Sequence, residues 1–102
     1  MLLSHNGFDV DQKLAADISG IDVILTGHTH DAVPEAVCIG KTLVLSSGSH
    51  GKYLGRIDLK VEGGQVVDAS STLIPVFSDV ISPDSEMTNL ISQLRAPYAV
   101  SY

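Results

Sequence analysis

One hundred and two residues are enough for one small domain, because domains commonly contain about 100–150 residues, and this length excludes a second independent core. Apolar residues make up 44% of the chain and charged residues 18%, a globular composition that excludes disordered, collagen-like and coiled-coil proteins. Twelve acidic against six basic residues give a net charge of −6, which argues against binding to nucleic acid or anionic lipid.

A chain of this size buries only roughly 60–65% of the surface that it exposes when unfolded, so stability would call for a metal, a partner or more chain. Cys38 is the only cysteine, which excludes an internal disulfide and a thiolate zinc site. The residues from Met1 to His5 have neither a basic n-region nor an apolar h-region, so no signal peptide is expected in this chain. No apolar run is long enough to predict a membrane span.

The apolar periodicity predicts an α/β or α+β fold, and the first two elements are a strand and a helix. Residues 1–3 resemble the end of a strand whose beginning is missing. A helix should follow, with Asp9 as its cap, Gln12 as the return partner of a capping box and Gly20 at its end. Its buried stripe is expected to consist of residues spaced four apart, Val10, Leu14 and Ile18.

Residues 21–25 are almost continuously apolar, which predicts a strand covered on both faces and parallel to residues 1–3. A loop over Gly27–Glu35 follows. Residues 36–39 and 42–45 then flank Gly40-Lys41, a good hairpin turn. We expect the first arm of this hairpin to run along residues 21–25, with the second arm ending at the same sheet edge as Leu3 and Leu25.

The second half of the chain predicts a longer hairpin and one helix. Residues 53–61 and 66–74 alternate around Gly63-Gly64. Ser82-Pro83 should cap a helix that runs to Arg95 and carries one apolar face, made of Met87, Leu90, Ile91 and Leu94. Residues 96–102 are interpreted as a linker.

The four histidines each follow a predicted strand: His5 after Leu3, His28 and His30 after Leu25, and His50 after Leu45. Ligands of open α/β sheets bind beyond the carboxyl ends of the strands, so this placement is what a binding site requires. In an extended loop His28 and His30 would lie about 6–7 Å apart at Cβ, which suits two neighbouring ions better than one. Gly27 would let the backbone turn closely beneath the metals.

Each of these interpretations has a structural alternative. A His-x-His pair after a strand is also common as a surface or core pair, and His5 could be a polar residue at a helix entry. Asp31 could hold a ligand imidazole through its second nitrogen or cap a turn. His50 is interpreted as a loop residue, with a ligand role as the alternative. Lys52 and Arg56 either meet an anionic substrate or are solvated. The six acids up to Glu35 suggest a cation site in the first third of the chain.

Several segments of the sequence resemble motifs of a known enzyme family. Ser4-His5-Asn6-Gly7 and Gly27-His28-Thr29-His30 resemble the last two motifs of the calcineurin-like metallophosphoesterases, in their 5′-nucleotidase branch. The segments Asp31-Ala32-Val33-Pro34 and Arg95-Ala96-Pro97-Tyr98 are closer still to the thiosulfohydrolases of the bacterial Sox sulfur-oxidation system. The resemblance implies half of a metallophosphoesterase sandwich, with a mixed sheet, β-hairpins, one covering helix and a C-terminal helix.

The resemblance also implies a site with two divalent metal ions. His5 and His28 would bind one ion and His30 its neighbour, with Asn6, Gly27, Thr29 and Asp31 as supporting or substrate-contacting residues. Manganese is expected, with zinc or iron as alternatives. Such an enzyme hydrolyses a cysteine S-thiosulfonate on a sulfur-carrier protein, its partner, and releases sulfate in the periplasm. Two metals would bind the oxygens of the anion and stabilise developing charge.

Other parts of the family pattern are absent from this sequence. The D-x-H, G-D and G-N-H-D/E motifs, which supply the bridging aspartate and the catalytic histidine, should lie upstream, so no catalytic residue is assigned in this chain. Asparagine is expected where His50 stands, so no role transfers to it. Residues 1–95 are therefore expected to be the C-terminal half of a catalytic domain, inactive alone, with 96–102 leading to another domain. A 5′-nucleotidase and a non-catalytic metal- or partner-binding module remain alternatives.

Overall fold

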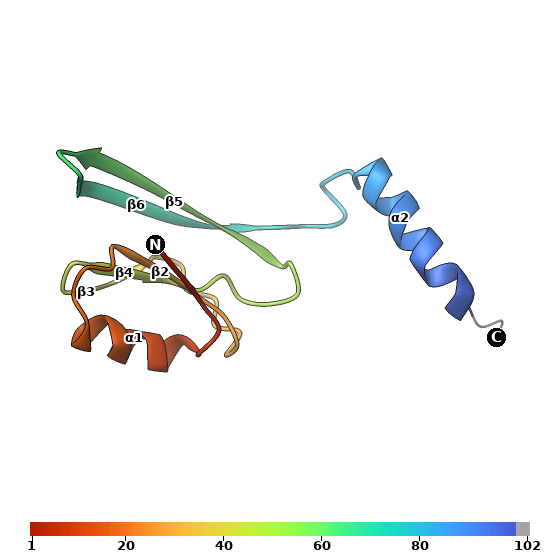
Figure 1. The fold of residues 1–102 in the computed structure, drawn as a ribbon. Helices are drawn as coiled ribbons and strands as arrows, with labels where there is room; N and C mark the ends of the chain where they lie inside the picture. Colours follow the sequence, from red (N-terminus) through yellow and green to blue (C-terminus); the bar gives the residue numbers. More distant parts are fainter. Residues whose placement is uncertain (100–102) are drawn as a thin grey trace.

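The computed structural model describes residues 1–99 (Figure 1). Its elements follow the expected order of α and β segments. In chain order they are β1 (Leu2–Ser4), α1 (Phe8–Asp17), β2 (Val23–Thr26), β3 (Val37–Ile39), β4 (Thr42–Leu45), β5 (Tyr53–Glu62), β6 (Gln65–Pro75), α2 (Ser85–Arg95) and the short 3-10 helix η1 (Ala96–Tyr98).

The first four strands form a mixed sheet in the order β1-β2-β4-β3. β1, β2 and β4 are parallel, with Leu3 opposite Leu25 and Leu25 opposite Leu45, so their carboxyl ends meet at one edge. We call this the carboxyl edge: the ends of β1, β2 and β4 and the loops that follow them. The parallel pairing of the first two strands is confirmed.

The expected position of the β3–β4 hairpin is wrong in one respect. Its second arm, β4, pairs with β2, whereas its first arm, β3, is antiparallel to β4 at the outside of the sheet. Burial explains this order, because β4 is buried at Thr42, Val44 and Leu45, as a central strand must be, whereas β3 is only half buried. The end of β4 still reaches the carboxyl edge.

The sheet is the middle of three layers: α1 covers one face and the β5–β6 hairpin lies over the other (Figure 1). Under α1, the core consists of Ala15, Ile24 and Val44, with Leu2, Phe8, Leu14, Ile21 and Ile39 packed around it. On the hairpin side, the backbone N–H of Ala36 donates to Ser71 Oγ at 2.7 Å. The predicted mixed sheet, hairpins and covering helix are confirmed.

The phase and the cap of α1 differ from expectation. Gly7 is the N-cap, Asp9 lies in the first turn, and the helix ends at Asp17 rather than reaching Gly20. Of the expected stripe, Val10 is 56% and Ile18 47% exposed, whereas Asp11 and Ala15 are buried. The spacing of apolar residues gave the wrong face because Ser4 and Asn6 donate hydrogen bonds to one oxygen of Asp11, which allows this carboxylate to face the sheet.

The cap of α2 also differs. Asp84, not Ser82, is the N-cap, and its Oδ1 accepts a hydrogen bond from the N–H of Glu86 at 3.0 Å. The predicted apolar face is exposed along its whole length, at Met87, Leu90, Ile91 and Leu94. Part of the segment interpreted as a linker is the short helix η1, and residues 100–102 lie outside the described residues.

The chain is extended, because α2 stands away from the sheet beyond the end of the hairpin (Figure 1). The Cα radius of gyration is 17.7 Å, compared with about 13 Å for a compact domain of this length. The accessible surface is 7734 Å², compared with about 5,500 Å² for a compact monomer of this mass. Neither α1 nor α2 is long and apolar enough to cross a lipid bilayer.

Candidate metal centre

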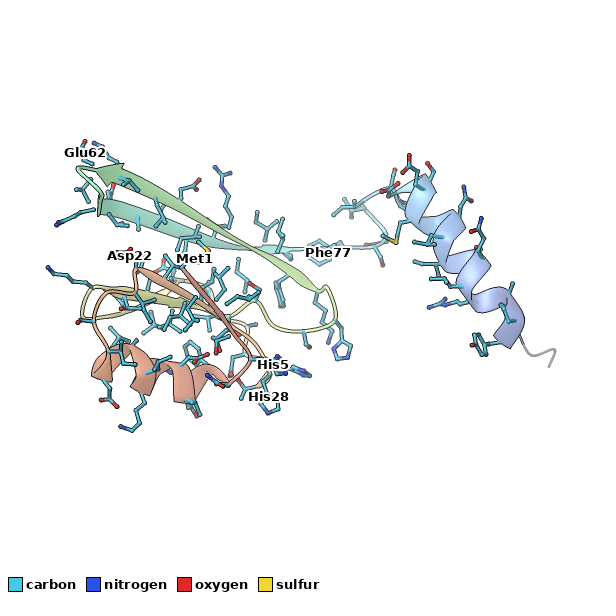
Figure 2. All side chains as sticks on the ribbon, in the orientation of Figure 1. Met1, His5, Asp22, His28, Glu62 and Phe77 are labelled. Carbon is cyan, nitrogen blue, oxygen red and sulfur yellow. The ribbon has the colours of Figure 1, made fainter. Side chains whose placement is uncertain are left out.

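The histidines gather at the carboxyl edge in two pairs. His5, just after β1, lies edge to face with His28, with ring centroids 5.0 Å apart and an interplanar angle of 66°. His30 and His50 form a second such pair at 5.6 Å and 80°. Figure 2 shows His5 and His28 together at this end of the sheet. The prediction that all four histidines share one sheet edge is therefore confirmed.

A backbone contact places His5 over the start of the loop that follows β2. The N–H of Gly27 donates to the carbonyl of Ser4 at 3.0 Å, at the last pair of β1 with β2, Ser4 opposite Thr26. A Cβ on Gly27 would lie 3.3 Å from His5 Nδ1. Glycine thus lets the backbone pass directly beside a histidine ring.

Thr29 joins the turn before α1 to the loop of the histidines. Its hydroxyl accepts a hydrogen bond from the N–H of Phe8 at 3.0 Å and donates one to Asp31 Oδ2. A Cβ on Gly7, whose φ is +101°, would lie 2.7 Å from Thr29 Cγ2. The Asp31 carboxylate thus partners Thr29 within the loop that carries His28 and His30.

Asp11 is a site residue that sequence reasoning missed. It is 0% exposed, and its Oδ1 accepts hydrogen bonds from Ser4 Oγ at 3.0 Å and Asn6 Nδ2 at 3.3 Å. The carboxylate therefore fixes the residues on both sides of His5. Its Oδ2 has no hydrogen-bond partner among the described residues. The sequence held one signal for this role: Asp11 stands four residues before Ala15, so both lie on the sheet-facing side of the helix.

The backbone of the histidine loops is strained. His28, His30 and His50 have φ values of +89°, +62° and +57°, and they are the non-glycine residues with positive φ in the described part of the chain. The extended conformation expected for His28 and His30 is therefore wrong. Such conformations cost about 1–3 kcal/mol each and concentrate at binding and catalytic sites.

The charges are less concentrated at this edge than expected. Asp22 lies at the opposite end of the sheet from His5 (Figure 2). Asp17 pairs with Lys13 at 2.8 Å, and its hydrogen bond raises the pKa of the exposed Lys13 ammonium. Arg56 pairs with Asp58 on the hairpin. The prediction that the acids surround a cation site is therefore wrong for Asp17 and Asp22.

Several known proteins are similar to this chain in sequence. No protein-family model matches the chain. The trifunctional nucleotide phosphoesterase YfkN of Bacillus subtilis is 32% identical over 78 residues, 74% of this chain and 5% of that protein. The uncharacterized metallophosphoesterase YunD of Bacillus subtilis is 35% identical over 65 residues, 64% of this chain and 14% of that protein. A 5′-nucleotidase of Diplobatis ommata is 29% identical over 97 residues, 78% of this chain and 17% of that protein.

Among solved structures, the sulfate thiohydrolase SoxB of Thermus thermophilus, in complex with glycerol, matches with a TM-score of 0.84 and 35% identity over 91% of this chain. The chain is related to the metallophosphoesterases and 5′-nucleotidases. The resemblance seen in the sequence is confirmed. The chain spans 17% of SoxB and between 5% and 19% of the four curated relatives.

Metallophosphoesterase relatives raise the question whether this edge fits metal ions. An imidazole nitrogen binds zinc at about 2.0–2.1 Å, so two rings on one ion have centroids roughly 4.6–5.6 Å apart for nitrogen–metal–nitrogen angles of about 90–120°. The His5–His28 separation of 5.0 Å falls in this range. Within residues 1–99, no three His, Cys, Asp or Glu side chains converge on one ion. The donors fit part of a metal site, and other ligands would have to complete it.

Proposed function

We propose that this chain contributes the histidine-bearing edge of a metal-dependent hydrolase with two divalent ions. His5 and His28 would bind one ion and His30 the other. Asn6, Gly27, Thr29 and Asp31 would hold these side chains in place. The proposal rests on the 35% identity to SoxB across 91% of the chain, together with the gathering of the four histidines at the carboxyl edge of the sheet.

The contacts of this edge are those of a preorganised site. The Asp11 carboxylate fixes the turn that carries His5, and Thr29 fixes the loop that carries His28 and His30. Bound ions would attract the oxygens of an anionic substrate and stabilise the charge that develops in the transition state. Imidazole nitrogens suit zinc and iron, whereas oxygen ligands suit manganese. We propose manganese from the resemblance to the Sox enzymes.

For the reaction, we propose hydrolysis of a cysteine S-thiosulfonate on a sulfur-carrier protein in the periplasm. The oxygen of water would join the sulfonate sulfur, and the bond from that sulfur to its sulfur neighbour would break. The electron pair stays with the sulfur on the carrier, and sulfate leaves. Residues 1–95 would form the C-terminal half of the catalytic domain and residues 96–102 a linker, which accounts for a chain that matches 17% of SoxB.

A second candidate is hydrolysis of a nucleotide phosphate ester at the same edge. The specific observation in its favour is that YfkN and the Diplobatis ommata protein are a nucleotide phosphoesterase and a 5′-nucleotidase. Both substrates present an anionic group with several oxygens, so the same ions would serve either reaction.

The test assays the full-length protein with two substrates. We expect sulfate release from a thiosulfonate-loaded carrier, measured by ion chromatography, to exceed phosphate release from nucleotides. Faster nucleotide hydrolysis would reverse this order in favour of the 5′-nucleotidase. In the His28→Ala variant we expect loss of activity and of about one bound ion. If this variant kept its metal content and its activity, the histidine-bearing edge would be a non-catalytic module instead.

A further inference from the structure

His50 has no role in the function proposed above, yet the fold holds it against the histidine loop. The N–H of Gly48 donates to the carbonyl of Asp31 at 2.7 Å, and the N–H of Val33 donates to the carbonyl of Ser46 at 3.1 Å. An isolated antiparallel bridge joins Ala32 to Ser47 between these two bonds. The loop after β4 and the loop after β2 are thus tied backbone to backbone, immediately before His50.

The conformation of His50 is specific as well. It has a φ of +57° and stands between two glycines of positive φ, Gly48 at +72° and Gly51 at +66°, with Ser49 intervening. A Cβ on Gly48 would lie 3.1 Å from the Tyr53 ring, so the loop is closely packed where it turns toward His50. A histidine held in left-handed backbone is an outlier of the kind found at binding sites.

The rings of His30 and His50 lie edge to face, as the rings of His5 and His28 do. Its centroids are 5.6 Å apart and its planes are 80° from parallel, compared with 5.0 Å and 66° for the first pair. Both distances fall within the roughly 4.6–5.6 Å expected for two imidazoles on one ion. We propose that His50 is a metal ligand that shares the second ion with His30, so that each ion receives two imidazoles from this chain.

This inference rests on the proposed function, since it assumes two ions at the carboxyl edge. It adds a ligand where the family resemblance supplies His30 alone. The two pairs come from different loops: the first joins the ends of β1 and β2, and the second joins the loops after β2 and β4. Because the second pair depends on contact between loops, its ion would also cross-link the end of β4 to the rest of the site.

The test measures Mn²⁺ binding to the full-length protein by the electron paramagnetic resonance signal of free Mn²⁺. His50→Ala is introduced into two backgrounds: His5→Ala, in which the His30–His50 site remains, and His30→Ala, in which the His5–His28 site remains. We expect a weakening of at least about tenfold in the first background, since even residues that only orient a ligand contribute about 10–100-fold. In the second background we expect no change. Ser49→Ala is the matched control and should leave both sites unchanged.

His50→Asn serves as a second variant if His50→Ala fails to fold, and the same weakening in the His5→Ala background is expected. If the protein bound two ions and substitution of His50 changed the affinity of neither, this inference would be overturned and the proposed function would stand. Weakening of the site that remains in the His30→Ala background would also overturn it. If the unmodified protein bound no Mn²⁺, the dimetal proposal and this inference would fall together.

Discussion

His5 and His28 lie edge to face with their ring centroids 5.0 Å apart, although they follow two different strands. The parallel pairing of β1 with β2 causes this proximity, because Leu3 stands opposite Leu25 and both strands end at the same edge. The hydrogen bond from Gly27 to Ser4 carries the pairing into the loop. Strand register therefore brings the two residues to the same edge of the sheet.

We expect Gly27→Ala to disturb this pair selectively. The new Cβ would lie 3.3 Å from His5 Nδ1, so the ring must shift by a few tenths of an ångström. Mn²⁺ affinity of the full-length protein should fall about tenfold, as it does when the residues that orient a ligand are lost. The melting temperature of the metal-free protein should change little, because Gly27 does not have a positive φ.

Gly64→Ala is the control for that variant. Gly64 has a φ of +75° in the turn between β5 and β6, with open space around it. Alanine there should lower the free energy of unfolding by about 1–2 kcal/mol through backbone strain and leave Mn²⁺ affinity unchanged. Equal affinities for Gly27→Ala and the unmodified protein would show that the close approach to His5 does not position the ring.

Gly7 and Thr29 allow a double-mutant test of how the two motifs dock. A Cβ on Gly7 would lie 2.7 Å from Thr29 Cγ2, and the φ of +101° adds strain. Gly7→Ala should therefore lower the free energy of unfolding by about 2–4 kcal/mol. Thr29→Ser removes Cγ2 and keeps the hydroxyl that bonds Phe8 and Asp31.

In the Gly7→Ala background, Thr29→Ser should recover about 1 kcal/mol or more, whereas by itself it should be neutral or slightly destabilising. Urea denaturation of the four proteins gives the coupling energy between these positions. Additive effects would show that the cost of Gly7→Ala comes from the backbone alone. The clash with Thr29 would then be relieved by rearrangement of the loop.

The sheet and the meeting of the histidines at its edge could be predicted because they depend on local signals. The apolar run before Thr26 required a covered parallel strand, and Gly40-Lys41 required a hairpin. Once β1, β2 and β4 are parallel, the residues that follow them must share one edge. The strand order was harder to predict, because either hairpin arm is short and apolar.

The pairing of the rings could not be predicted from the sequence. It depends on positive φ at His28, His30 and His50, a conformation that is uncommon for residues other than glycine. The prediction of which face of α1 is buried was wrong for a related reason. A carboxylate faces the sheet only because Ser4 and Asn6 donate to it, and no pattern within the helix contains those partners.

Removal of metal should destabilise the full-length protein. A ligand that binds only the folded state contributes about 2.7 kcal/mol at a concentration of 100 times its Kd. Dialysis against a chelator should therefore lower the melting temperature, and Mn²⁺ should restore it in a concentration-dependent way. His28→Ala should show a smaller response to Mn²⁺. An identical melting temperature with and without chelator would contradict binding of structural ions at this edge.

Substitutions of Asp11 separate the effect of its negative charge on stability from the effect of its hydrogen bonds. Asp11→Ala removes the acceptor of Ser4 Oγ and Asn6 Nδ2 and should lower the free energy of unfolding by about 1–3 kcal/mol. Asp11→Asn keeps an acceptor oxygen for both donors and replaces Oδ2, which has no partner among the described residues, so it should cost less than about 1 kcal/mol.

Asp9→Ala is the matched control, because Asp9 lies in the same first turn but is exposed, and it should cost only about 0.3–1 kcal/mol through the helix dipole. Urea denaturation compares the three variants. Asp11→Asn should also retain Mn²⁺ binding, since Asn6 and Ser4 still hold the turn around His5. If Asp11→Asn destabilised the protein as much as Asp11→Ala, the negative charge rather than the two hydrogen bonds would be what stabilises this turn.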